Sequence, residues 1–262
     1  RSYFEIASNH IPATIEKIID AAIRSGIPAR DIQVLAPMYR GTAGIDAINQ
    51  LMQELLNPLQ KGQFSFEASQ FHYRTSDKVI HLVNDAEVNV FNGDLGYITD
   101  LIPGKYTESK QDEIVIDFDG NEISYPRNEW YKIRLAYAMS IHKSQGSEFP
   151  VVILPITSAS KRMLERNLIY TAITRAKSKL ILLGELQAFD YATKHIGTAR
   201  KTYLIERFSD LTESSEEANK PILETSNQTD SQQSYILTEE NWTSIPAMIG
   251  ISQEDLQEFF GK

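Results

Sequence analysis

The chain has 262 residues, no cysteine and a formal net charge of −9. Without cysteine it forms neither disulfides nor thiolate metal sites. It also lacks a run of about 18 apolar residues and a signal-peptide pattern, which argues against a membrane protein or a secreted one. We expect a cytoplasmic protein with one large domain that carries an insertion.

The excess acidity lies at one end of the chain. Residues 209–262 hold eleven acidic residues and two lysines, a net charge of −9. Residues 1–208 therefore contain 24 of the 35 acidic and 24 of the 26 basic residues, and their net charge is zero. The low overall pI does not exclude DNA or RNA as a partner of this neutral body.

The first part of the sequence alternates between strand and helix patterns. Residues 3–7 are strand-like, and the apolar spacing of residues 11–26 predicts a helix. Residues 32–37 form a continuous apolar run, typical of a strand that is buried on both faces, and residues 44–57 again have helical spacing. Because Arg1 is not a methionine and directly precedes a strand, we expect a piece of a longer protein.

The pattern changes between residues 73 and 130. Short β-like segments are separated there by the turn dipeptides Asn92-Gly93, Pro103-Gly104 and Asp119-Gly120. We predict a small all-β insertion, a barrel, within the α/β domain.

The alternation returns after the insertion. We expect strands over residues 134–142, 151–156 and 179–185, and a helix over residues 161–178. Strands and helices that alternate with short links predict an α/β fold with a doubly wound parallel sheet.

The acidic end divides into two parts. Residues 209–234 are rich in Ser, Thr, Glu, Asn and Gln, and this composition predicts a disordered linker because it buries little apolar surface. Residues 235–262 regain apolar residues, and Ser252 is a candidate N-cap of a short helix. This end is either a solubilising extension or a tethered peptide that docks on a protein partner or masks a DNA channel.

Several enzyme motifs are absent from the sequence. It contains no G-x-x-x-x-G-K-[ST], no G-x-S-x-G and no H-E-x-x-H. The five histidines have no metal-ligand spacing, so we expect no metal site in this chain. A self-contained hydrolase is therefore a poor interpretation.

Three groups of residues can carry chemistry. Arg40 follows the carboxyl end of a predicted buried strand, the edge where open α/β sheets bind ligands, and suits a phosphate. Thr171 and Arg175 share one face of a predicted helix. The alternatives are a surface ion pair for Arg40 and a helix-dipole partner for Arg175.

The third group is a polar loop around Gly146. Its side chains and backbone amides can bind an anion, and Glu148 is an acceptor suited to a sugar hydroxyl. The alternative is a solvated loop closed by a Lys143–Glu148 ion pair. The candidate phosphate donors are His142, Lys143, Ser144 and Gln145.

These three segments, in this order along the chain, resemble the motifs of a known family. VLAPMYRG (residues 34–41), SIHKSQGSEF (140–149) and YTAITRAKSKL (170–180) resemble motifs IV, V and VI of superfamily 1 helicases. The likeness is closest to the RecD-like branch, the relatives of the exodeoxyribonuclease V alpha subunit, and covers most of residues 1–208.

The resemblance implies a domain organisation. Residues 1–72 and 131–208 would form the second RecA-like motor domain, which lacks a P-loop, and residues 73–130 an SH3-like β insertion. ATP would bind between this domain and an N-terminal motor domain that supplies the P-loop and the Mg²⁺ ligands.

The resemblance also implies residue roles. Arg40 and Arg175 would reach the γ-phosphate as arginine fingers, while Gly146 and Glu148 would contact the nucleotide. The residues expected to hold single-stranded DNA are Ser140, His142, Lys143, Ser144 and Gln145, together with Asn92 in the insertion.

Three aromatic residues of the insertion leave two interpretations open. Phe91, Tyr97 and Tyr125 either stack on DNA bases or form the core of the barrel.

The implied function is the motor region of an ATP-dependent 5′→3′ DNA helicase, inactive by itself. One alternative is a non-catalytic nucleic-acid-binding or clamp module that retains the fold. Another is a subunit of a RecBCD-type complex.

Overall fold

The computed structural model describes residues 2–68 and 70–197. The predicted linker (residues 209–234) and the predicted terminal helix at Ser252 lie outside these residues. Within the described part of the chain, none of the helices has the length and apolar character needed to cross a membrane.

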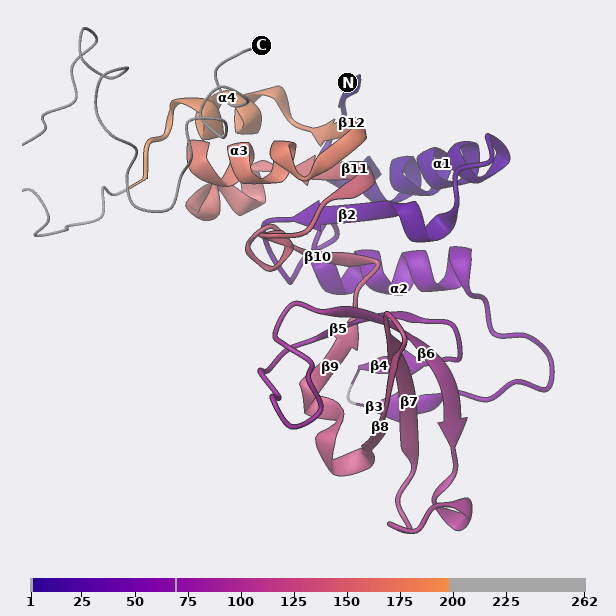
Figure 1. Ribbon diagram of the computed structural model, residues 1–262. Helices are drawn as coiled ribbons and strands as arrows, with labels where there is room; N and C mark the ends of the chain where they lie inside the picture. The colour runs from indigo at the N-terminus through magenta and orange to yellow at the C-terminus, as the bar shows by residue number, and fades with distance from the viewer. Residues whose placement is uncertain (1, 69, 198–262) are drawn as a thin grey trace, which may run out of the picture. The chain divides into compact units, whose positions relative to one another are not determined.

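The larger part of the structure is a five-stranded parallel sheet in the order β1-β12-β11-β2-β10 (Figure 1). Every residue of β2 is buried, as is most of β11, because helices cover both faces of the sheet. The strands are β1 (Ser2–Glu5), β2 (Ile32–Ala36), β10 (Ala138–Ser140), β11 (Phe149–Ile156) and β12 (Ala176–Gly184).

In the described part of the chain, two helices pack on each face of this sheet. α1 (Ile11–Arg24) and α2 (Ile45–Leu56) share one apolar cluster with it. α3 (Arg166–Thr174) and α4 (Leu186–Lys194) share the other. Their buried residues recur every three or four positions, so each helix turns one apolar stripe towards the sheet. The predicted doubly wound α/β fold is confirmed.

The second part is an antiparallel sheet in the order β8-β7-β6-β5-β9, inserted between α2 and β10. Its strands are β5 (Lys78–His81), β6 (Leu95–Ile102), β7 (Glu113–Phe118), β8 (Asn121–Pro126) and β9 (Ile133–Leu135). A separate hairpin, β3 (Phe66–Ala68) and β4 (Phe71–Tyr73), precedes it. This antiparallel sheet extends to Leu135, beyond residue 130, where the insertion was predicted to end. The boundaries of the motor domain and the insertion remain a prediction.

A predicted turn dipeptide joins β7 and β8. Phe118 pairs with Asn121, which leaves Asp119 and Gly120 as a two-residue loop. Their φ angles are 54° and 90°, and positive values at both positions suit the right-handed twist of a hairpin.

The run of residues 134–142 is not the single strand that its apolar pattern predicts. β9 belongs to the antiparallel sheet and β10 to the parallel one. The residues between them bond to both: the Ala136 amide donates to the Lys78 carbonyl (2.8 Å), and the Val34 amide donates to the Tyr137 carbonyl (3.2 Å). Because both strands are buried, the apolar pattern carries no sign of the change of sheet.

The helix predicted over residues 161–178 is also shorter in the structure. A 3₁₀ segment, Ser158–Met163, precedes α3, and Ala176 already pairs with Phe149 in the parallel sheet. The Phe149 amide donates to the Arg175 carbonyl (2.8 Å), so strand pairing begins as soon as the helix ends.

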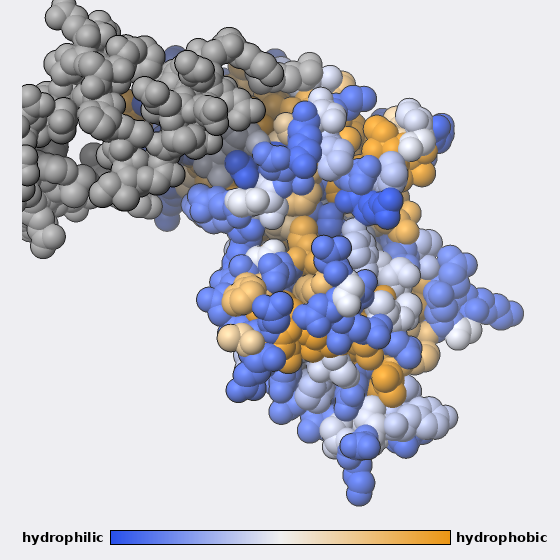
Figure 2. Space-filling view, in the orientation of Figure 1, coloured by the Kyte–Doolittle hydropathy of each residue, from blue (hydrophilic) through white to orange (hydrophobic). Residues whose placement is uncertain are grey.

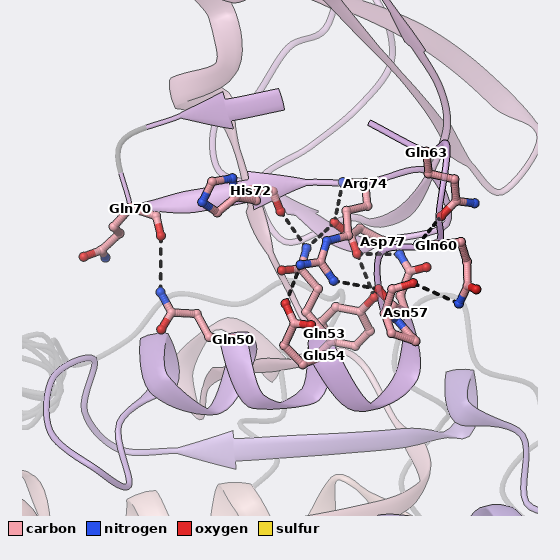
Figure 3. A network of polar contacts seen from close by, with 12 residues as sticks. Gln50, Gln53, Glu54, Asn57, Gln60, Gln63, Gln70, His72, Arg74 and Asp77 are labelled. Carbon is pink, nitrogen blue, oxygen red and sulfur yellow. Dashed lines mark hydrogen bonds and ion pairs between the residues drawn. The ribbon is translucent and has the colours of Figure 1, made fainter. Parts of the chain in front are cut away.

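Buried polar groups fill the place where the insertion joins the parallel sheet, here called the neck (residues 73–78 and 135–138). The Asp77 carboxylate accepts hydrogen bonds from Gln53 Nε2 (2.6 Å), Asn57 Nδ2 (2.8 Å), Tyr137 Oη (2.9 Å) and the Arg74 amide (2.7 Å). Figure 3 shows Gln53 of α2 and Asn57, the residue that follows α2, reaching towards Asp77. Burial raises the pKa of Asp77, although these hydrogen bonds oppose the shift.

A buried lysine occupies the other side of the neck. Lys78 Nζ donates to Gln33 Oε1 (2.9 Å), and Gln33 Nε2 donates to the carbonyls of Ala136 (3.1 Å) and Tyr137 (3.0 Å). Burial lowers the pKa of Lys78 to about 8 because the charged amine loses its hydration. Both chain segments of the neck are thus held by directional hydrogen bonds.

Candidate functional site

The polar loop of residues 140–149 connects two strands of the parallel sheet. It leaves the carboxyl end of β10, forms a 3₁₀ turn over His142–Ser144, and enters the amino end of β11. Gly146 has a φ of 87°, a left-handed conformation that side chains rarely adopt. The loop therefore crosses from one end of the sheet to the other.

Two of the predicted phosphate donors are engaged inside this loop. The buried Ser144 hydroxyl donates to the Ile141 carbonyl (2.8 Å), and the Ser140 hydroxyl accepts from the Lys143 amide (3.3 Å). His142 and Gln145 are exposed. Serine at positions 140 and 144 thus shapes the loop, while His142 and Gln145 face solvent.

Lys143 links the loop to the insertion. Its Nζ donates to Asn92 Oδ1, and a pocket of about 460 Å³ lies between the loop and the Asn92-Gly93 turn. The turn is fixed by a hydrogen bond from the Asn92 amide to Asn84 Oδ1 (2.9 Å). Glu148 pairs instead with Lys177 (3.5 Å), so the Lys143–Glu148 interpretation is wrong.

Arg175 lies at the end of α3 and contacts the other side of the loop. Its Nη1 donates to the Ser147 carbonyl (2.9 Å) and its Nε to the Thr171 carbonyl (3.3 Å). Within residues 2–68 and 70–197 no carboxylate pairs with it. A partly buried guanidinium without an acidic partner, beside the exposed acceptor Glu148, suits an anionic ligand.

Arg40 lies at the opposite end of the sheet. It follows the carboxyl end of β2, whereas Arg175 precedes the amino end of β12, and both strands run parallel to β11. β12 spans nine residues, so its ends are roughly 25 Å apart at about 3.3 Å per residue. The structure therefore does not bring Arg40 and Arg175 together, although the motif resemblance implies one shared phosphate for them.

The Arg40 loop is held close to the start of α2. The Ile45 amide donates to the Met38 carbonyl (3.0 Å), and the Asp46 amide donates to the Tyr39 carbonyl (3.1 Å). A Cβ at Gly44 would come within 2.6 Å of the Arg40 carbonyl oxygen, so only glycine fits. Arg40 itself is exposed.

The three aromatic residues of the insertion differ in exposure. Tyr125 is 1% exposed and belongs to the core, as one interpretation predicts. That interpretation is wrong for Phe91 and Tyr97, whose exposed fractions are 47% and 38%. Figure 2 shows orange apolar areas interrupted by blue hydrophilic residues on the viewed surface of the insertion.

Some contacts at the site are not evident from the sequence pattern. Lys177, the partner of Glu148, lies two residues after Arg175, and its position in the basic run RAKSK is the only signal. Arg134 stacks on Tyr39 (5.0 Å from guanidinium carbon to ring centroid), a contact between segments 95 positions apart that no local pattern reveals. Among the described residues, no cluster of three or more histidines or carboxylates could hold a metal ion.

The parallel sheet with helices on both faces resembles the RecA-like domain of superfamily 1 helicases, and the antiparallel sheet takes the place of an SH3-like insertion. Residues 48–118 match the SH3 domain of ATP-dependent RecD-like DNA helicases, and residues 135–183 match the UvrD-like helicase C-terminal domain. The resemblance to RecD-like helicases is thereby confirmed.

Relatives with this resemblance are longer than the present chain. The ATP-dependent RecD2 DNA helicase of Deinococcus radiodurans is 34% identical over 67% of this chain and 23% of its own length. The RecBCD enzyme subunit RecD of Mycolicibacterium smegmatis is 29% identical over 58% of this chain and 25% of its own length. The chain thus spans about a quarter of each of these two proteins.

Among solved structures, the Pif1 helicase from Bacteroides in complex with ADP-AlF3 and ssDNA aligns with a TM-score of 0.42 and 20% identity. The alignment covers 69% of this chain and 45% of that one.

Proposed function

We propose that this chain is the second motor domain of an ATP-dependent DNA helicase that moves 5′→3′ on single-stranded DNA. An N-terminal motor domain would supply the P-loop and the Mg²⁺ ligands. In this proposal residues 1–72 and 131–208 form the motor domain and residues 73–130 the insertion. The 5′→3′ direction is inferred from the RecD-like resemblance.

One observation carries this proposal: the polar loop is attached at both ends. On one side Lys143 bonds to Asn92 of the insertion, and on the other side Ser147 accepts from Arg175. A displacement of the loop by bound DNA would reach Arg175 through the Ser147 carbonyl. Such a connection is what a motor needs to couple strand binding to ATP hydrolysis.

The two ends of the sheet then have different roles. Ala36 pairs with Ser140, so Arg40 and His142 leave the sheet at the same end. We assign this end to the phosphates of single-stranded DNA, with Lys143, Gln145 and Asn92 as further donors. At the other end, Glu148 accepts from the ribose, the amides around Gly146 approach the nucleotide, and Arg175 stabilises charge that develops on the γ-phosphate.

The deciding experiment compares three arginine variants of the full-length protein. Arg175→Ala should lower kcat for ATP hydrolysis by about 10³-fold or more, the usual value of an arginine finger, and leave DNA binding measurable. Arg40→Ala should weaken DNA binding and keep ATP turnover at saturating DNA. Arg166→Ala removes an exposed arginine of α3, the helix that ends beside Arg175, and should change neither ATP turnover nor DNA affinity.

Normal turnover in the Arg175→Ala variant would refute the assigned role. A full-length protein that binds DNA without any DNA-stimulated ATP hydrolysis would favour the non-catalytic clamp instead.

A further inference from the structure

A pocket of about 710 Å³ lies away from the polar loop, between the β3–β4 hairpin and the 3₁₀ segment Arg127–Lys132. Among the residues that the structure describes, two arginines and no acidic residue line it. The lining also includes the buried rings of Phe71, Tyr73 and Trp130, together with Tyr131, which is 69% exposed. None of these residues has a role in the function proposed above.

Both arginines of this pocket lie on aromatic rings. The Arg127 guanidinium carbon is 4.9 Å from the centroid of Trp130, and that of Arg134 is 5.2 Å from the centroid of Phe71. Each also pairs with a carboxylate outside the lining: Arg127 with Asp112 (3.2 Å) and Arg134 with Asp46 (3.3 Å). A guanidinium held in this way keeps donors for a further acceptor, because its five N–H groups exceed what one carboxylate uses.

Contacts with neighbouring groups hold the buried aromatic rings of the pocket in place. The Trp130 indole N–H donates to the Tyr125 carbonyl (2.9 Å), and its ring stacks on Phe66 with centroids 5.4 Å apart. Tyr73 meets the same indole edge-on at 6.4 Å. A preformed aromatic surface loses little conformational entropy when a planar ligand binds.

Arg134 connects this pocket with the Arg40 loop. Its guanidinium lies over the ring of Tyr39, the residue before Arg40, as well as over Phe71. Arg134 thus contacts both the Arg40 loop and the lining of the pocket.

We propose that this pocket binds bases of single-stranded DNA, with Tyr131 as a stacking platform and Arg127 and Arg134 as partners for the adjoining phosphates. Aromatic faces combined with arginines are the recurring way in which proteins hold single strands without reading sequence. The site rests on the proposed function and adds a second contact for the strand, built from the hairpin and the insertion.

Tyr131→Ala tests the stacking, because the exposed ring can be removed without opening the core. With an oligo-dT probe at fixed salt, fluorescence anisotropy should show an affinity about fivefold to a hundredfold lower, the value of one or two stacked bases. Tyr131→Phe should restore it. Tyr106→Ala is the matched control, since that tyrosine is 72% exposed on another turn of the insertion, and it should bind like the unmodified chain.

An oligonucleotide with abasic sites separates bases from phosphates. Removing the bases should lower the affinity of the unmodified chain and abolish the difference between it and Tyr131→Ala. An undiminished difference would overturn the stacking role.

Trp130 gives a direct readout of the pocket. The chain has two tryptophans, so Trp242→Phe leaves Trp130 as the only one. Titration with oligo-dT should then quench its emission. Quenching by an acidic proline-containing peptide and not by oligo-dT would overturn the proposal in favour of a peptide partner.

Lys143→Ala distinguishes failure of this inference from failure of the proposed function. If Lys143→Ala weakens oligo-dT binding while Tyr131→Ala does not, the pocket proposal fails and the helicase assignment stands. If neither variant weakens binding, both fail.

Discussion

The parallel sheet and the neck of the insertion are both buried, but they are held in different ways. In β11, Val152, Ile153 and Leu154 are each 0% exposed and pack against the helices on the two faces. In the neck, Asp77 is 0% exposed and accepts a hydrogen bond from the Tyr137 hydroxyl, while Gln33 of β2, also 0% exposed, donates to the Tyr137 carbonyl. The sheet relies on apolar packing, and the neck relies on hydrogen bonds.

Because of this difference, the two parts can share one structure and still have separate tasks. Apolar burial stabilises in proportion to area and has little directional preference. Hydrogen bonds depend on angle, so a buried polar network fixes how one segment is oriented against another. The neck thereby sets where the insertion presents Asn92 to Lys143.

The largest expected effect belongs to the sheet. Ile153→Ala should lower the free energy of unfolding by about 4 kcal/mol, because it removes buried methyl groups and leaves a cavity between two packed faces. Urea denaturation measures this change. Ile23→Ala makes the same substitution at a site that is 42% exposed, and it should cost under about 1 kcal/mol. Equal losses in the two variants would mean that the sheet is not the stabilising core.

The next effect is a pH dependence that originates in the neck. In the unfolded chain Lys78 holds its proton up to its usual pKa of about 10.5, whereas in the folded protein it loses the proton near pH 8. Between these values the unfolded state binds more protons, so the free energy of unfolding rises with pH, by up to about 3 kcal/mol. As pH falls through 8 this stabilisation is lost.

Lys78→Met should remove that part of the pH dependence. The measurement is the difference in unfolding free energy between the two proteins from pH 7 to pH 10. Burial raises the pKa of Tyr73 and of Tyr137, which destabilises the fold at still higher pH. This contribution is present in both proteins and cancels in the difference. Lys17→Met, at an exposed lysine of α1, should leave the profile unchanged, and parallel profiles for Lys78→Met would contradict the buried charge.

The sequence predicts the sheet better than the neck, for a physical reason. Apolar periodicity identifies β2, β11 and the helices α1 and α2, because burial of one stripe or of both faces repeats along the chain. It does not show that residues 134–142 cross from one sheet to another, since both strands are apolar. It also does not show that Asp77 is fully buried, because its donors come from segments up to 60 residues away.

At the candidate site, too, local patterns are evident from the sequence and contacts between distant segments are not. The density of polar residues around Gly146 identifies the loop, and motif order indicates its two ligands. The motif resemblance implies one shared phosphate for Arg40 and Arg175, but Arg40 follows the carboxyl end of β2 and Arg175 precedes the amino end of β12, at opposite ends of the parallel sheet. Local spacing likewise leaves out the Arg134–Tyr39 contact, which exists only because the neck holds the insertion beside the Arg40 loop.

The smallest of these effects on stability tests the neck most specifically. Asp77→Asn replaces one carboxylate oxygen by an NH2 group, which can only donate. The NH2 group then faces a group that donated to Asp77, such as Gln53 Nε2 or Tyr137 Oη, and one hydrogen bond is lost. The free energy of unfolding should fall by about 2 kcal/mol. Asp190→Asn, at an exposed aspartate of α4, is the matched control, and it should cost under about 0.5 kcal/mol.

The orientation of the insertion should change more than its stability. Hydrogen exchange at the Ala136 amide, which donates to the Lys78 carbonyl across the neck, should become faster in Asp77→Asn. The Ile116 amide, inside the β7–β8 pairing, should remain protected because the antiparallel sheet keeps its own ladder. Ile153→Ala should accelerate both amides through global unfolding. Uniform acceleration in Asp77→Asn would instead show that the neck only adds stability and does not orient the insertion.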